Sequence, residues 1–279
     1  MSAPDAASAD FCYRHPDRRS FIVCQRCTRT ICPSCQTQAA VGFHCPECVN
    51  EARANAPRTS PKLTTKVRRL ATGGGPIVTY SLIGVTAFVY VLQLLLGGIM
   101  TNLLAYAPIL TGVEPWRMLT TVFVHSQTSF LHILFNMFTL FIFGRLLEPA
   151  IGHGRFLLLY LLSGFGGSLA VLLLNPDGVV VGASGAVYGL FGAFFAIQRG
   201  LGGNSAQLIV LIGINLLIGF FVPGIAWQAH VGGLLIGGLI GLILLKTRGP
   251  RHRRRQVLML GGVAIGMVLL TVVAFSLAF

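Results

Sequence analysis

The stretch VVVGASGAVYGLFGAF, residues 179–194, decides how this chain folds. It is apolar apart from Ser184 and Tyr188, which lie about one helical turn apart and therefore share a face. Glycines on either side of Ser184 let another backbone come close, and the first amides of a helix beginning here would have no partner inside it. Serine at such a position is also an ordinary N-cap. The stretch alone therefore predicts a closely packed membrane helix with a polar group at its start.

A second glycine-rich stretch, WQAHVGGLLIGGLIGLILL at residues 227–245, offers the matching surface. Glycines follow His230 by three, seven and eleven residues, so they share its helical face. These positions are Gly233, Gly237 and Gly241, and the first stretch presents Gly185, Gly189 and Ala193 in the same way. Small residues of this kind let two helices approach closely. Packing the two ridges together would bring Ser184 within reach of His230.

Composition places the chain in a lipid bilayer and divides it in two. Of the 279 residues, 54% are hydrophobic and only 10% are charged, which is far from the balance of a soluble domain. All seven cysteines lie between Cys12 and Cys48, whereas nearly all long apolar runs follow Gly75. We predict a small module at 1–50, a basic linker rich in Pro and Gly at 51–76, a membrane core at 77–245, and a basic loop with a last helix at 246–279.

Seven apolar runs have roughly the length needed to span a membrane. They cover residues 77–97, 131–147, 156–174, 184–200, 207–222, 227–245 and 256–278. The predicted fold is an all-α membrane protein with a core of six transmembrane helices and one further helix after it. The long connection at 98–130 carries Trp116 and many apolar residues, so we expect it to lie partly in the membrane interface.

Positive charge sets the expected orientation. Beyond residue 50, fifteen of the sixteen Lys and Arg residues fall on one side if the linker is cytoplasmic, and Arg117 alone falls outside. The first fifty residues also lack the apolar segment of a signal peptide, so we expect a cytoplasmic N-terminus, an extracytoplasmic C-terminus and a cell-membrane location. The formal charge of +13 then reflects contact with anionic headgroups rather than with nucleic acid.

The cysteines occur in pairs with the spacing of zinc ligands. Every pair is separated by two residues, which lets a tight turn direct both side chains at one tetrahedral ion. The pairs are Cys12 with His15, Cys24 with Cys27, Cys32 with Cys35, and Cys45 with Cys48. Four pairs complete two zinc shells, and disulfides are disfavoured by an odd number of cysteines and a cytoplasmic location. His44 is left over and is an alternative to Cys45.

The run from Cys12 to Cys48 resembles the B-box-type zinc fingers. That resemblance implies interleaved pairs, with Cys12, His15, Cys32 and Cys35 on one ion and Cys24, Cys27, Cys45 and Cys48 on the other. So small a module buries little core, so two structural zinc ions would supply most of its folding free energy. We expect the module to recruit a protein partner or substrate.

Further polar residues sit in the second apolar run. His132 and Asn136 are four residues apart and share a helical face, and His125 precedes them by one loop. Polar side chains inside a membrane are costly and often functional, although hydrogen bonding between helices would also account for them.

Taken in order, these residues resemble the rhomboid intramembrane serine proteases over about residues 77–245. The motifs are Trp116-Arg117, His132 with Asn136, Gly182-Ala183-Ser184-Gly185, and Ala229-His230 with Gly233. The resemblance implies Ser184 as nucleophile and His230 as general base, with oxyanion donors in Asn136, His132 and the Ser184 amide. Tyr188 resembles the ring that stacks on the catalytic histidine. The implied activity is cleavage of transmembrane protein substrates.

Acidic residues are too few to complete a triad. Beyond residue 76 they are Glu114, Glu148 and Asp177, none of which lies in an apolar run near His230. The expected machinery is therefore a serine–histidine dyad that needs no catalytic cofactor. The alternative is a catalytically silent rhomboid-like scaffold that binds transmembrane helices.

Overall fold

The computed structural model describes residues 10–39, 42–55, 75–222 and 224–279. The chain divides into two compact units, residues 1–62 and 63–279, and each is described by itself. Most of the predicted linker at 51–76 lies outside the described residues. Its beginning is helical, because helix α1 (Pro46–Ala54) continues through Glu51, Ala52 and Ala54, which favour helix.

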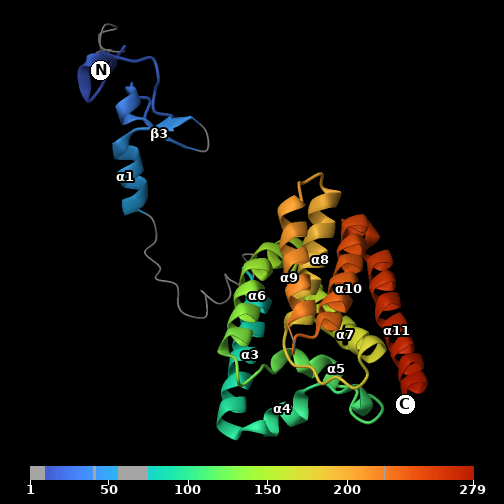
Figure 1. Ribbon diagram of the computed structural model, residues 1–279. Coiled ribbons are helices and arrows are strands. Elements are labelled where there is room, and N and C mark those ends of the chain that lie inside the picture. Colours follow the sequence, from blue (N-terminus) through green and yellow to red (C-terminus); the bar gives the residue numbers. More distant parts are fainter. Residues whose placement is uncertain (1–9, 40–41, 56–74, 223) are drawn as a thin grey trace. The chain divides into compact units, whose positions relative to one another are not determined.

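The N-terminal unit is built around its cysteines. Two short antiparallel pairs of strands, β1 with β2 and β3 with β4, precede α1 (Figure 1). These strands are β1 (Phe11–Cys12), β2 (His15–Arg19), β3 (Thr37–Gln38) and β4 (Phe43–His44), with a 3₁₀ turn, η2 (Pro33–Cys35), between the pairs. Six of the seven cysteines are buried, and Ile31 is the buried aliphatic side chain among them. A core this small cannot hold the unit together by apolar burial alone.

The second unit is a bundle of helices, as predicted (Figure 1). The long helices are α3 (Ile77–Leu96), α6 (Phe130–Ile151), α7 (His153–Leu174), α8 (Ser184–Gly200), α9 (Ala206–Phe221), α10 (Trp227–Lys246) and α11 (Arg253–Ala278). Among the described residues, five are long and apolar enough to cross a membrane, namely α3, α6, α7, α10 and α11. Helices α8 and α9 have 17 and 16 residues. The chain is therefore a multi-pass membrane protein.

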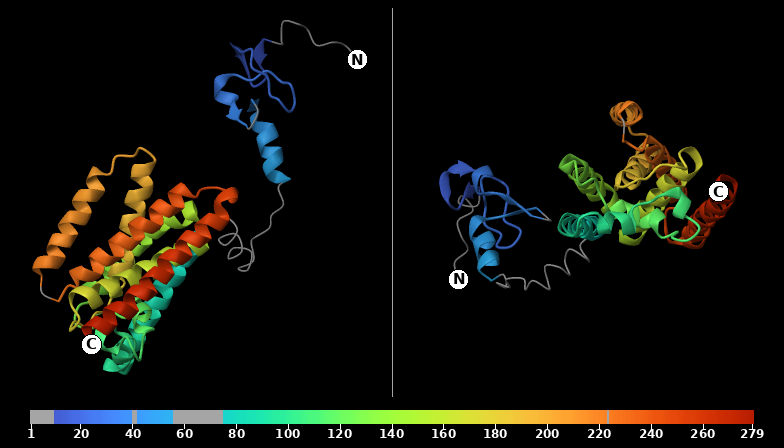
Figure 2. Two further views of the ribbon diagram at one scale, coloured as in Figure 1. Left: turned by 90° about the vertical axis from the view of Figure 1, so that its right-hand side faces the viewer. Right: turned by 60° about the horizontal axis from the view of Figure 1, so that its bottom comes forward.

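Helices α7, α8 and α10 form the centre of the bundle. They carry the most buried residues, whereas α9 and α11 are largely exposed and lie at the periphery in Figure 2. Helix α6 runs to Ile151, four residues beyond the predicted end, and passes through Pro149 near its last turn. Buried Glu148 accounts for this extension, because its carboxylate accepts the Val78 and Thr79 amides at the start of α3.

The connection between α3 and α6 is ordered by short helices. They are α4 (Gly98–Leu104), η3 (Pro108–Leu110), α5 (Arg117–Thr120) and η4 (Thr121–Phe123). Buried Arg117 holds the connection together by donating to the carbonyls of Asn102 and Ala105 and pairing with Glu114. Trp116 is 53% exposed, and its position in the membrane interface stays a prediction.

Candidate functional site

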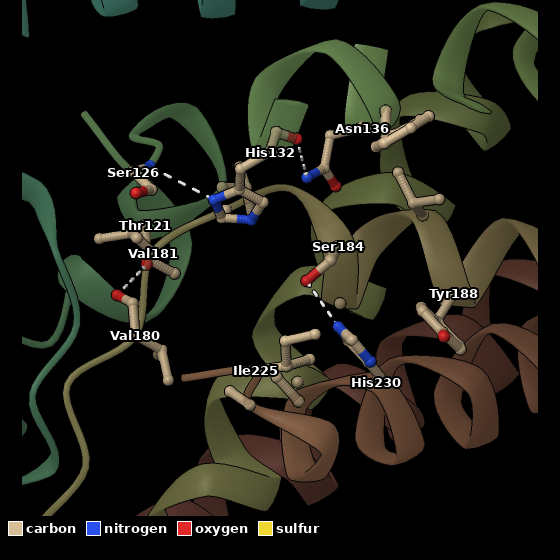
Figure 3. A pocket seen from close by; sticks show the side chains of 18 of the residues that line it. Thr121, Ser126, His132, Asn136, Val180, Val181, Ser184, Tyr188, Ile225 and His230 are labelled. Carbon is tan, nitrogen blue, oxygen red and sulfur yellow. Dashed lines mark hydrogen bonds between the residues drawn. The ribbon is translucent and has the colours of Figure 1, made fainter. Parts of the chain in front are cut away.

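Ser184 and His230 meet inside the bundle. Ser184 begins α8 and His230 lies in the first turn of α10, and the serine Oγ is 2.9 Å from the histidine Nε2 (Figure 3). This is a normal hydrogen-bond distance. His230 is only 7% exposed, and Ser184 is half-buried.

Close backbone packing brings the two residues together. A methyl group at Gly233 would overlap the Gly185 carbonyl oxygen, and one at Gly237 would overlap the Gly189 carbonyl oxygen. At Gly241 the added carbon would lie 2.7 Å from the Cα of Ala193. These are the two predicted ridges in direct contact, so the glycines are required because no side chain fits between the helices.

Tyr188 orients the histidine from one side. Its ring lies parallel to the His230 ring, with centroids 4.2 Å apart and an interplanar angle of 8°. The other ring nitrogen, Nδ1, is buried and has no hydrogen-bond partner among the described residues. The imidazole is therefore positioned by ring stacking and by its bond to Ser184, without a carboxylate.

His132 and Asn136 face this pair across a cavity (Figure 3). The Ser126 amide donates to His132 Nδ1 at 3.3 Å, so a neutral His132 carries its proton on Nε2. That Nε2 lies next to Gly182, where an added methyl group would be 2.7 Å from it. Asn136 Nδ2 donates to the His132 carbonyl at 2.8 Å, which leaves its second amide hydrogen available.

The loop before Ser184 is held by residues that sequence reasoning did not assign. Thr121 accepts the Gly182 amide on its carbonyl and donates its hydroxyl to the Val180 carbonyl. His125 Nε2 accepts the Ala183 amide at 3.3 Å. Burial, with a contribution from nearby His132, lowers the pKa of His125 to about 3, so the ring stays neutral and can accept. In the sequence, the closeness of His125 to His132 and Asn136 was the feature that could have predicted a role for His125 in this site.

The cavity around these groups has a volume of about 680 Å³. Its polar lining includes Ser184, His230, His132 and Asn136. Its apolar lining comes from α6, α8, α9 and the loop before α10. It is large enough for several residues of an extended peptide, and it places a serine, an imidazole and hydrogen-bond donors around one space.

The N-terminal unit contains two clusters of ligand atoms. One consists of Cys12, His15, Cys32 and Cys35, and the other of Cys24, Cys27, Cys45 and Cys48. Within each, the donor atoms lie within 4.8 Å of one another. This is the interleaved pairing implied by the resemblance, and His44 belongs to neither cluster.

The spacing inside the clusters suits a tetrahedral ion. The Cys32 and Cys35 sulfurs lie 3.4 Å from His15 Nδ1, and the Cys27 and Cys45 sulfurs lie 3.6 Å apart. Zinc bonds of about 2.3 Å to sulfur and 2.0 Å to nitrogen at tetrahedral angles separate ligand atoms by roughly 3.6–3.8 Å. Both clusters therefore fit a zinc-sized cation, and all seven cysteines are free thiols.

The membrane unit is similar to proteins of a known family. Residues 112–247 match the Rhomboid domain family. The chain is 35% identical over 145 residues to "Putative rhomboid protease YdcA" of Bacillus subtilis, which covers 50% of this chain and 72% of the relative. It is 33% identical over 213 residues to Rhomboid protease GluP of the same organism, covering 70% of this chain and 40% of that protein.

Plant proteins are also similar. The match to RHOMBOID-like protein 6, mitochondrial, of Arabidopsis thaliana has 38% identity over 149 residues, 51% of this chain. The chain spans 48% of that relative and 35% of RHOMBOID-like protein 1.

The fold and the site define a multi-pass membrane protein with a hydrogen-bonded serine–histidine pair lining a cavity among its helices. With the similarities above, the chain belongs to the rhomboid family, whose members include named proteases.

Proposed function

We propose that this chain is an intramembrane serine endopeptidase that cleaves transmembrane segments of other proteins. The observation that carries the proposal is the 2.9 Å bond between Ser184 Oγ and His230 Nε2 at the wall of a cavity in the bundle. A serine hydroxyl is a weak nucleophile until a base accepts its proton, and this contact supplies the base.

The proposed reaction follows from these positions. Ser184 Oγ attacks the scissile carbonyl while His230 Nε2 takes its proton, and the imidazolium then protonates the leaving amine. Water hydrolyses the acyl-enzyme with the same histidine as base. The Tyr188 ring, stacked at 4.2 Å, keeps the imidazole aligned in place of an orienting carboxylate.

Three donors are proposed for the oxyanion. The Ser184 amide belongs to the first turn of α8 and has no partner within the helix. His132 Nε2–H is directed to this side because the Ser126 amide occupies Nδ1. The free amide hydrogen of Asn136 is the third donor. Donors fixed before reaction stabilise the developing charge most effectively in a site shielded from water.

The test is cleavage of a single-span model substrate by the detergent-purified chain. Ser184→Ala and His230→Ala should each abolish cleavage, and the double variant should be little worse, because both residues act on one step. Asn136→Ala should retain more activity, since losing one of three donors costs about 3–4 kcal/mol. Cleavage by Ser184→Ala at the wild-type rate would refute the proposal. Helix binding without cleavage by the unaltered chain would instead support a silent scaffold.

Orientation and the metal are part of the proposal. Fifteen of sixteen Lys and Arg residues beyond residue 50 favour a cytoplasmic N-terminus and an extracytoplasmic C-terminus.

The two Cys/His clusters favour two structural zinc ions in the N-terminal unit. These ions would stabilise the folded unit, and the folded unit would recruit a protein partner or substrate.

A further inference from the structure

A second cavity, of about 280 Å³, lies where α10 turns into α11. It shares no lining residue with the cavity around Ser184. Its walls come from the end of α6, the start of α7, the ends of α8 and α10, and the first turn of α11. The polar residues that line it are Arg155, Thr247, Arg248 and Gln256.

Arg155 is held in place by its neighbours. Its Nε donates to Gln256 Oε1 at 2.7 Å, and its Nη1 donates to the Ile151 carbonyl at 3.1 Å. Gln256 is only 5% exposed and is itself fixed, because its Nε2 donates to the Thr247 hydroxyl at 2.8 Å. The guanidinium is therefore preorganised, so an incoming acceptor would not have to order a flexible side chain.

The charge of this cavity is unbalanced. Among the described residues, no carboxylate lies within ion-pair distance of Arg155 or Arg248. Glu148, near this end of the bundle, is fully buried, and its oxygens accept from Val78, Thr79 and His153. Two lining arginines without a carboxylate partner give the cavity a positive charge, which attracts an anion.

The surroundings indicate a lipid anion. Apolar side chains also line the cavity, namely Ile151, Ile197, Leu244 and Leu245, so apolar surface adjoins the charged groups. A phosphate group bound by guanidinium donors, with acyl chains along such a surface, satisfies both features. An inorganic anion would use the arginines but leave the apolar surface uncovered.

We propose that Arg155 and Arg248 form a binding site for the phosphate of an anionic phospholipid between the end of α10 and the start of α11. The lipid would fasten α11 to the six-helix core through charge-assisted hydrogen bonds. The site is separate from the proposed dyad, so it stands whether or not the chain cleaves substrates.

The test uses the full chain in neutral detergent, titrated with phosphatidylglycerol or phosphatidylcholine while thermal unfolding and lipid adducts in native mass spectrometry are recorded. Arg248→Gln should raise the phosphatidylglycerol concentration for half-maximal stabilisation about tenfold, because one charge-assisted contact is lost. Arg199→Gln is the matched control: it removes an exposed arginine from the end of α8 that lies outside the cavity lining, and it should bind as the unaltered chain does.

A second variant tests the charge directly. Gln256→Glu places a carboxylate beside Arg155 and should abolish the preference for phosphatidylglycerol. Equal stabilisation by the two lipids, or equal binding by Arg248→Gln and Arg199→Gln, would overturn the proposal. Full competition by inorganic phosphate at the same concentration would assign the cavity to a free anion instead of a lipid.

Discussion

The contact between α8 and α10 can be perturbed with a single methyl group. In Gly233→Ala the new Cβ would overlap the Gly185 carbonyl oxygen and lie 2.7 Å from its carbonyl carbon, whereas ordinary contact begins at 3.4 Å. The helices must therefore part by more than about 0.7 Å, because the carbonyl carbon alone requires that shift and the carbonyl oxygen lies closer still. Overpacking of this kind typically costs about 1–3 kcal/mol of stability.

The larger effect should be on the proposed catalytic pair. Ser184 is adjacent to Gly185 and His230 is one turn from Gly233, so parting the helices would stretch the 2.9 Å contact between Ser184 Oγ and His230 Nε2 out of hydrogen-bond range. A misplacement approaching 1 Å reduces rates about a hundredfold, so we expect kcat to fall by about two orders of magnitude.

The assay has two readouts and an internal control. Substrate cleavage reports turnover, and labelling by a fluorophosphonate reports the reactivity of Ser184 without a substrate. Gly238→Ala adds the same methyl group to the same helix, but its Cβ would lie 3.7 Å from the Gly192 carbonyl oxygen, an ordinary contact. This variant should stay within about twofold of the unaltered chain.

One result would refute the reasoning. If folded Gly233→Ala labels and cleaves at the unaltered rate, close packing of the two ridges is not what positions the serine and histidine. An equal loss in Gly233→Ala and Gly238→Ala would show instead that α10 tolerates no added volume anywhere.

Three further predictions concern other parts of the chain. Elemental analysis of the purified full chain should find two zinc ions, and Cys24→Ser should lower the content toward one; a zinc-free, folded protein would contradict the assignment. Reporters fused to the two ends should be active on opposite sides of the membrane, because seven spans are odd in number, and activity on one side would exclude that count. Glu148→Ala should lower stability by about 3 kcal/mol or more, measured by thermal unfolding in detergent, because it leaves the Val78 and Thr79 amides buried without an acceptor. An unchanged midpoint would mean that water replaces the carboxylate.

Several features of the site were predictable from local pattern. The glycine ridges at Gly233 and Gly237 follow a helical period, so the face they share with His230 can be read directly from the chain. Apolar runs likewise predicted all seven long helices found among the described residues. The predicted ends were less accurate: α6 continues past residue 147 because Glu148 is anchored by α3, a contact between segments about seventy residues apart.

Roles that depend on hydrogen bonds across segments came from the structure. Asn136 was expected to face the oxyanion, yet one of its amide hydrogens is used by the carbonyl of His132 on the same helix. The proton position on His132 is set by the Ser126 amide, and no periodicity predicts that contact.

The sequence by itself determined that this is a membrane protein with a cysteine-rich module, because hydropathy, charge and the spacing of cysteine pairs are local properties. The tertiary structure decided which Cys and His pairs cluster together, that Ser184 Oγ and His230 Nε2 lie 2.9 Å apart, and that two arginines line a cavity beside Gln256. These are distances between atoms far apart in the chain. They depend on how all the helices pack at once, and a change of less than an ångström decides whether a hydrogen bond forms.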